Sequence, residues 1–238
     1  MKILIKAVIF DLDDTLYYEL DYVKSGFRTV SRYIGSKYGV SEKEFYKLQL
    51  DILEKEGRGK VFDLALENFS LPLDEVEKML AVYRSHEPEG IQLYEDVEYI
   101  LEKLKKEGKY KTGIITDGNA QVQWNKIKSL GLIDLVDEII VTDDYGVDKR
   151  KPAPFAYLRL LEIFKIRAEE AVYIGDNPLK DFIGARKLGM KTIRIIREKG
   201  MHIEKRMEPV YEADFEVNTL RDMEEILDRM DRSEGCDK

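Results

Sequence analysis

The amino-acid sequence predicts an α/β fold, with a doubly wound parallel sheet and an inserted all-helical subdomain. Two observations lead to this prediction. Short β-branched segments alternate with stretches whose apolar residues recur at helical spacing, which is the pattern of successive βαβ units. A long stretch after the first of these segments breaks the alternation, because it contains helical patterns and no convincing strand.

Five segments have the composition of buried strands. The first, residues 6–10, is short and apolar and ends abruptly at Asp11, so the acid lies at the carboxyl end of the strand. Helical patterns separate the later segments, and right-handed crossovers through those helices make the sheet parallel. The other strands are expected at 112–116, 138–142, 171–175 and 191–196, and the helices at 96–107, 119–130, 154–166 and 181–188.

The interrupting stretch, residues 17–91, is predicted to be a helical cap. Ser41 followed three residues later by Glu44 is typical of a helix start, because each side chain can accept from an orphan backbone N–H. The core is then formed by residues 1–16 and 92–238, and the tail from residue 231 is polar. The cap helices are expected at 19–38, 41–56, 61–68 and 73–85.

Composition excludes several classes of protein. Hydrophobic residues make up 44% of 238 residues, too many for a disordered chain, and the net charge of −8 argues against a nucleic-acid partner. The only cysteine, Cys236, excludes a disulfide framework and favours a reducing, cytoplasmic setting. The N-terminal apolar segment is short and interrupted by Lys6, so we expect no signal peptide or membrane span. Abundant Lys and Glu with few Gln and Asn favour a thermophilic source.

Polar side chains gather where four of the predicted strands end. In an open parallel sheet, ligands bind at the carboxyl ends of the strands, so these residues are expected on one rim. Each group alone is a weak signal, but the ordered set predicts a single site. Its members are Asp11, Asp13, Asp14 and Thr15 after the first strand, Thr116, Asp117 and Gly118 after the second, Lys151 near the third, and Asp176 and Asp181 after the fourth.

This set resembles the four motifs of the haloacid dehalogenase-type (HAD) hydrolases, over nearly the whole chain. The resemblance implies a Rossmann-like core, and the insertion resembles the C1 cap of subfamily I, which includes phosphatases, phosphomutases and dehalogenases. The matching residues are Asp11-x-Asp13-x-Thr15, then Thr116, then Lys151 followed by Pro152, then Gly175-Asp176-x-x-x-x-Asp181.

The resemblance also implies roles for the catalytic residues. Asp11 would be the nucleophile that forms an aspartyl-phosphate, and Asp13 would protonate the leaving oxygen and later activate water. Thr116 would hydrogen-bond a phosphoryl oxygen, and Lys151 would bridge the nucleophile and the phosphate. Thr15, Asp117 and Gly118 are expected to contribute to substrate binding, through backbone amides among other groups.

A metal ion is implied as well, because carboxylates facing a phosphate dianion would repel it. Mg²⁺ favours oxygen ligands. By the family pattern its ligands would be the side chains of Asp11, Asp176 and Asp181, the last directly or through water, and the backbone carbonyl of Asp13.

Asp13 favours one branch of the family. Dehalogenases generally lack an acid there, since halide leaves without a proton, so the sequence predicts a phosphatase acting on a small phosphorylated metabolite. A sugar phosphomutase is the first alternative, followed by a dehalogenase. A non-catalytic phospho-acceptor domain of the response-regulator type is disfavoured by Asp13 and by the insertion. Many relatives have Asn where this chain has Asp117. The substrate and the oligomeric state stay open.

Overall fold

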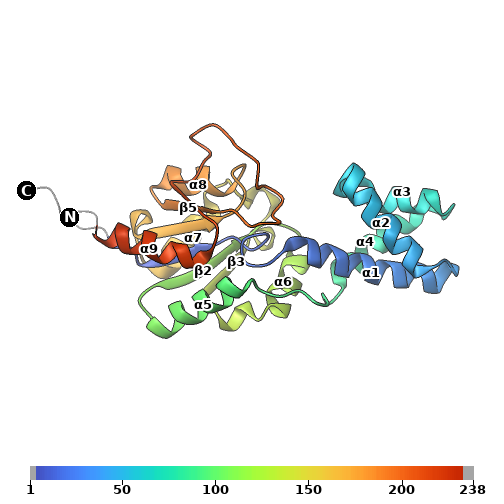
Figure 1. Cartoon of the computed structure of the whole chain (residues 1–238), viewed down its shortest axis with the longest axis horizontal. Helices are drawn as coiled ribbons and strands as arrows, with labels where there is room; N and C mark the ends of the chain where they lie inside the picture. The colour runs from blue at the N-terminus through green and yellow to red at the C-terminus, as the bar shows by residue number, and fades with distance from the viewer. Residues whose placement is uncertain (1–3, 233–238) are drawn as a thin grey trace, which may run out of the picture. The chain divides into compact units, whose positions relative to one another are not determined.

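The structure, a computed structural model of the chain, describes residues 4–232. Six parallel strands form one sheet in the order β3-β2-β1-β4-β5-β6 (Figure 1). The first strand therefore lies in the middle, and the order reverses between β1 and β4. The strands are β1 (Ala7–Phe10), β2 (Lys111–Thr116), β3 (Glu138–Val141), β4 (Ala171–Gly175), β5 (Lys191–Ile195) and β6 (Phe215–Val217).

Helices cover both faces of this sheet, as the sequence predicts. Helices α7 (Phe155–Phe164) and α8 (Asp181–Leu188) pack on one face, where Ile9 of β1 and Tyr173 of β4 share one apolar cluster. Helices α5 (Glu95–Glu107), α6 (Ala120–Ser129) and α9 (Leu220–Arg232) belong to the other layer, in which α5 contacts α9 (Figure 1). All four residues of β1 are completely buried, which explains its continuous apolar run.

The chain divides into two compact units, Met1–Glu19 with Gln92–Lys238 and Leu20–Ile91. The second unit is helical and has its own core, in which Val23, Phe27, Val30 and Ile34 place a stripe of apolar side chains along one helix. The Ser41 hydroxyl accepts from the backbone N–H of Glu44 at 3.3 Å, as expected of an N-cap. The helices here are α1 (Glu19–Tyr38), α2 (Glu42–Glu56), α3 (Val61–Asn68) and α4 (Val76–Ser85), with the 3-10 helices η1 (Arg58–Lys60) and η2 (Leu73–Glu75).

The sequence pattern does not predict strand β6 or helix α9. Strand β6 has only three residues, of which Phe215 and Glu216 are exposed, so it lacks the apolar run by which the other strands are recognised. Helix α9 did carry a signal, since Leu220, Met223 and Leu227 are buried at helical spacing. The end of the polar tail, including Cys236, lies outside the described residues. Within residues 4–232, no helix is long and apolar enough to cross a membrane.

Candidate active site

Three buried carboxylates meet at the carboxyl end of the sheet. Asp11 directly follows β1 and Asp176 directly follows β4; these two strands pair in parallel, with Phe10 opposite Ile174. Asp181 is the first residue of α8 and completes the group. One ligand oxygen from each carboxylate lies within 4.8 Å of the others, and the described residues contain no second acidic group of this kind. The Asp11–Asp176–Asp181 group thus gathers residues that are far apart in sequence.

The electrostatics of this group call for a cation. Burial raises the pKa of Asp11 to about 7, although Lys151 opposes the rise. Burial, and then repulsion by Asp181 and Asp11, raises the pKa of Asp176 well above its usual range. Asp176 is buried, with 7% of the residue exposed. A hard divalent cation with oxygen ligands fits this donor set, because it would neutralise the excess negative charge.

Lys151 is the buried counter-ion of the group. Its ammonium contacts the carboxylate of Asp11 and lies 2.7 Å from Oδ1 of Asp181. It also donates to the hydroxyl of Tyr173 at 2.9 Å and to the carbonyl of Ile115 at 3.4 Å. Burial alone would lower the pKa of Lys151, but Asp11 and Asp181 hold it well above its usual range. The lysine therefore stays charged inside the protein.

Close packing places the segment that carries Lys151. The bond between Lys151 and Pro152 is cis. A Cβ on Gly184 of α8 would come within 2.5 Å of the Pro152 carbonyl oxygen, so only glycine lets α8 approach this segment. Gly175 has a similar role, because a Cβ there would meet Oδ2 of Asp181 at 2.5 Å. The two glycines bring the lysine and the third carboxylate to the strand ends.

The Asp13 carboxylate is held by three side chains. Tyr17 donates its hydroxyl at 2.6 Å, Gln123 donates its amide at 3.0 Å, and the ammonium of Lys126 lies 2.7 Å away. Burial alone would raise the pKa of Asp13, but Lys126 and these hydrogen bonds lower it to about 2. Asp13 is therefore an ionised carboxylate in a fixed position, two residues after Asp11.

The remaining predicted site residues lie around these groups. The Thr15 hydroxyl donates to Oδ2 of Asp11 at 3.5 Å, and the Thr116 hydroxyl accepts from the amide of Gln123. Gly118 has a φ of 133°, which a residue with a side chain rarely adopts. Oδ1 of Asp117 accepts from the Thr142 hydroxyl at 2.8 Å and from the Lys151 backbone N–H at 3.1 Å. Asp117 thus ties the loop after β3 to the end of β2.

Comparison with known proteins agrees with this geometry. A family model described as haloacid dehalogenase-like hydrolase matches residues 8–195. The chain belongs to the haloacid dehalogenase-like hydrolase family.

Relatives in this family include enzymes named as phosphatases. A glyceraldehyde 3-phosphate phosphatase of Methanopyrus kandleri is 32% identical over 94% of this chain and 97% of its own length. The pyrophosphatase PpaX of Bacillus cereus is 31% identical over 96% and 99%. Among solved structures, a HAD phosphatase from Thermococcus onnurineus is 30% identical, with a TM-score of 0.62 over 94% of this chain and 98% of that one. A 2-haloacid dehalogenase from Pseudomonas syringae is 27% identical, with a TM-score of 0.65 over 95% and 99%.

Sequence reasoning missed several residues around the site of this hydrolase. Gln123 and Lys126 lie on the helix predicted at 119–130, and no motif of the sequence assigns them a role. They lie three residues apart and are almost fully buried beside Ile127, so they are polar residues on a buried helix face. That pattern is the signal that could have found them. Tyr173, inside an apolar strand segment, and Tyr17 carried no comparable signal.

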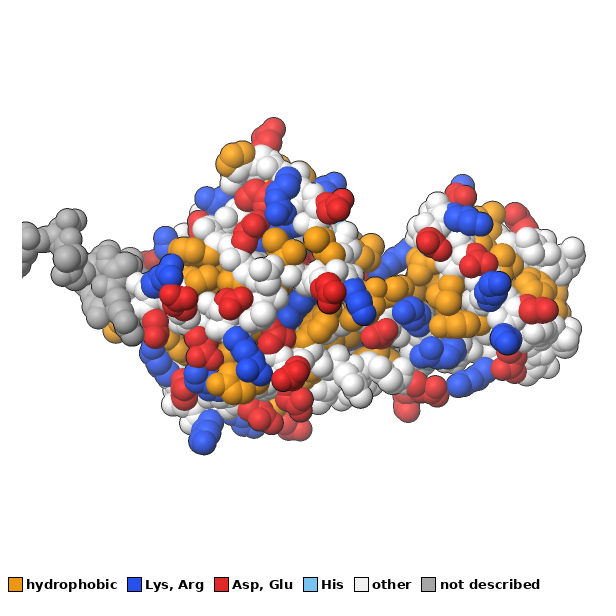
Figure 2. Space-filling view, viewed as in Figure 1, with side chains coloured by type: hydrophobic (Ala, Val, Ile, Leu, Met, Phe, Trp, Pro, Cys, Tyr) orange, Lys and Arg blue, Asp and Glu red, His pale blue; other side chains and the backbone are white. Residues whose placement is uncertain are grey.

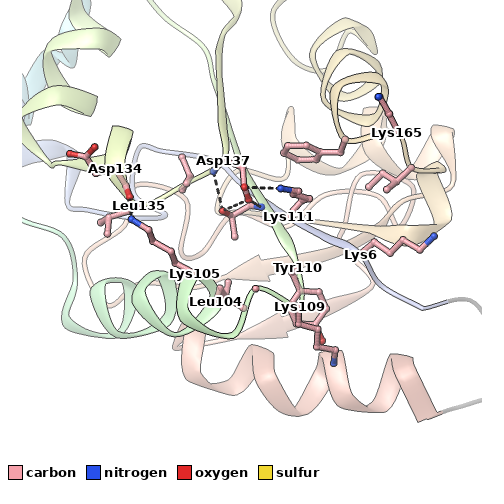
Figure 3. Close-up of a pocket in the computed structure, with 15 residues that line it drawn as sticks. Lys6, Leu104, Lys105, Lys109, Tyr110, Lys111, Asp134, Leu135, Asp137 and Lys165 are labelled. Carbon is pink, nitrogen blue, oxygen red and sulfur yellow. Dashed lines mark hydrogen bonds and ion pairs between the residues drawn. The ribbon is translucent and has the colours of Figure 1, made fainter.

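A separate hollow of the hydrolase fold lies far from this site. It is a cavity of about 500 Å³ at the amino ends of the strands, next to Lys6 and Lys111, where β1 and β2 begin. Figure 3 shows that the ammonium groups of Lys6, Lys109 and Lys165 point in different directions rather than toward one centre. Lys111 is paired with Asp137 at 3.0 Å. These cations do not converge on a ligand, so the cavity is not the candidate site.

The surface of the protein carries charges of both signs. On the face seen in Figure 2, Lys and Arg side chains are interspersed with Asp and Glu side chains over the described residues. No extended basic patch is visible on that face, in keeping with the net charge of −8.

Proposed function

We propose that the protein is a Mg²⁺-dependent phosphomonoester hydrolase that acts on a small phosphorylated metabolite through an aspartyl-phosphate. The observation that carries this proposal is the pairing of two acids on one turn. Asp11 lies in the buried carboxylate group, and Asp13 is fixed beside it by Tyr17, Gln123 and Lys126. Relatives that are named as phosphatases, and that match this chain over almost their full length, support the proposal.

Asp11 is the proposed nucleophile. One of its carboxylate oxygens attacks phosphorus, the bond from phosphorus to the ester oxygen breaks, and an aspartyl-phosphate forms. Lys151 contacts Asp11 from the protein interior and supplies a positive charge beside the developing negative charge. The hydroxyls of Thr15 and Thr116 are proposed to orient the nucleophile and a phosphoryl oxygen.

Asp13 is the proposed acid and base. Because Asp13 is ionised in the structure, it must first take up a proton from water, which it then gives to the departing oxygen. Ionised again, it takes a proton from the water that hydrolyses the aspartyl-phosphate. Its three partners keep the carboxylate in one orientation, so little reorganisation is needed during the reaction.

Magnesium is proposed to be held by the side chains of Asp11, Asp176 and Asp181, with the backbone carbonyl of Asp13 as a further ligand. When bound, the ion would neutralise the carboxylates and the phosphate charge. The side chains of the first three residues gather in the structure and are buried, which supports this choice.

Asp13 also supports hydrolysis of phosphate esters over dehalogenation. One structural relative is titled a 2-haloacid dehalogenase, but a departing halide needs no proton, whereas a departing alkoxide does. A sugar phosphomutase is the alternative that retains Asp13. A mutase returns the phosphoryl group to a second hydroxyl of the sugar, so release of inorganic phosphate separates the two.

The helical unit, Leu20–Ile91, is proposed to be the cap that selects the substrate. The relatives named above provide two substrates with which to begin, glyceraldehyde 3-phosphate and pyrophosphate. We propose a screen of phosphorylated metabolites that includes both, with released phosphate as the readout. The cytoplasmic setting and the thermophilic source stay predictions from composition.

Hydrolysis of p-nitrophenyl phosphate by the purified chain is the direct test. We expect turnover with Mg²⁺ that stops on addition of EDTA and returns when Mg²⁺ is supplied in excess. Asp11→Asn and Asp11→Ala are expected to abolish turnover and to trap no phosphorylated protein on acid quenching. Undiminished turnover by both variants would exclude Asp11 as the nucleophile, and turnover unaffected by EDTA would exclude the metal.

A further inference from the structure

One acid of the site, Asp117, does not belong to the metal-binding carboxylate group. It follows Thr116 at the end of β2 and is largely buried, with 9% of its side chain exposed. Its Oδ1 accepts hydrogen bonds from the Thr142 hydroxyl and from the Lys151 backbone N–H. A carboxylate beside a phosphate site repels the phosphate unless a cation compensates it.

The compensating cation is Lys180. Its ammonium lies 3.6 Å from Oδ2 of Asp117, the oxygen that is not engaged by the other two donors. Lys180 comes immediately before Asp181, in the turn that leads from Asp176 into α8. Its side chain is 30% exposed, so it lies at the rim of the site rather than beneath it.

The charge of Lys180 also reaches the buried carboxylates. Burial raises the pKa of Asp11, and Lys180 is one of the two cations, after Lys151, that oppose this rise. Burial and Lys151 disfavour the charged form of Lys180 itself, but Asp11, Asp181 and Asp117 more than compensate, so its pKa is raised. Lys180 therefore brings a positive charge beside Asp117 at the rim of the site.

Lys180 also has N–H donors that its contact with Asp117 does not use. An ammonium carries three N–H donors. Within residues 4–232, the contact with Asp117 is the one ion pair of Lys180, and at 3.6 Å it is longer than a hydrogen bond. Lys151, by contrast, is surrounded by Asp11, Asp181 and Tyr173. The partly exposed Lys180 can donate to an incoming anion while it keeps its ion pair with Asp117.

We propose that Lys180 is a second phosphate-binding cation of the site, and that it neutralises the neighbouring Asp117. The inference rests on the proposed phosphatase function and adds a residue to its substrate site. Lys180 would donate to a non-bridging phosphoryl oxygen or to an acidic group of the substrate next to it, and no covalent step passes through it.

A double-mutant cycle on this pair tests the proposal. The variants are Lys180→Met, Asp117→Asn and the double variant, and the probe is inorganic phosphate as a competitive inhibitor of the Mg²⁺-loaded enzyme. Asn at position 117 keeps an oxygen that can accept from Thr142 and from the Lys151 N–H. Lys187→Met is the matched control, because Lys187 is an exposed lysine on α8, the helix that Lys180 precedes.

The charges predict the order of the inhibition constants. Lys180→Met leaves Asp117 uncompensated, so inhibition by phosphate should weaken by about tenfold or more. Asp117→Asn removes the repulsion and frees Lys180, so inhibition should be unchanged or tighter. The double variant restores neutrality and should recover part of the loss, whereas Lys187→Met should match the parent.

Two results would overturn the inference. One is a Lys180→Met enzyme with the parental inhibition constant, whatever its melting temperature, because Lys180 would then stabilise the loop only. The other is a double variant that phosphate inhibits as weakly as it inhibits Lys180→Met alone. If the parent hydrolyses no phosphate ester, the proposed function fails, and calorimetric binding of phosphate to the same Mg²⁺-loaded variants still decides the role of Lys180.

Discussion

The ammonium of Lys151 lies 2.7 Å from Oδ1 of Asp181, and both side chains are completely inaccessible to solvent. The pair joins the loop after β3 to the first residue of α8, and through Asp11 it reaches the end of β1. Removing one partner of a buried ion pair leaves the other charge desolvated without compensation. Stability and the proposed catalysis therefore depend on the same lysine.

Lys151→Met is expected to lower kcat by about 10²–10³-fold, because a charge next to the developing negative charge is lost. It should also cost about 3–5 kcal/mol of stability without metal, since Asp11 and Asp181 stay buried and unpaired. Lys151→Arg should recover stability better than activity, because its charge is kept but its planar group cannot replace a point donor. Steady-state kinetics measure the effect on kcat, and thermal unfolding with and without Mg²⁺ measures the effect on stability. A Lys151→Met enzyme with parental kcat would contradict the proposed role.

Asp13→Asn is expected to reduce turnover of alkyl phosphates by about 10²–10⁴-fold, because a poor leaving group needs the proton. For p-nitrophenyl phosphate, formation of the phosphorylated enzyme should survive while its breakdown slows, so the intermediate should accumulate. Rapid quench with labelled substrate separates the two steps. Equal losses for good and poor leaving groups at the formation step would contradict proton donation by Asp13.

Tyr173→Phe removes the hydroxyl that accepts from Lys151 at 2.9 Å but keeps the ring that packs edge-on against Tyr157. Because a hydrogen bond to a charged group is lost inside the protein, we expect a loss of about 1.5–3 kcal/mol of stability. Lys151 keeps its two carboxylate partners, so KM should change little and kcat by less than about tenfold. Denaturant unfolding and steady-state kinetics check both statements. A loss in kcat as large as that of Lys151→Met would show that Tyr173 does more than position the lysine.

Glu75 makes stability depend on pH in the helical unit. Hydrogen bonds from Lys37, Lys78 and Tyr33 lower the pKa of Glu75 from 4.5 to about 2. The unfolded chain thus binds this proton more tightly, so the stabilisation is complete above about pH 4.5 and disappears as the pH falls toward 2.

Glu75→Gln should therefore melt at a lower temperature than the parent at pH 7, with a difference that shrinks between pH 4.5 and 2. Glu77→Gln, at an exposed position on α4, the helix that Glu75 precedes, is the control and should follow the parent at each pH. Calorimetry across this range measures both variants. A difference that stays constant with pH would mean that the charge of Glu75 is not what stabilises the fold.

Most of the fold could be predicted because its signals are local. Each of the first five strands is a short β-branched run, and an acid or a hydroxyl comes at or just after the end of several of them, as Asp11 does after β1 and Thr116 does in β2. Parallel pairing then places those residues on one rim, whatever the details of packing. Strand β6 could not be predicted, because an exposed three-residue edge strand has no such run.

The sequence by itself determined the α/β class, the helical insertion and the residues that lie at the strand ends, because composition and periodicity act over a few neighbouring residues. Only the tertiary structure decided which of these residues touch. It placed Lys151 between Asp11 and Asp181, turned Gln123 and Lys126 toward Asp13, and set Lys180 against Asp117. Such contacts depend on strand order, register and the close approach of helices, which bring together residues as distant along the chain as Asp11 and Lys151.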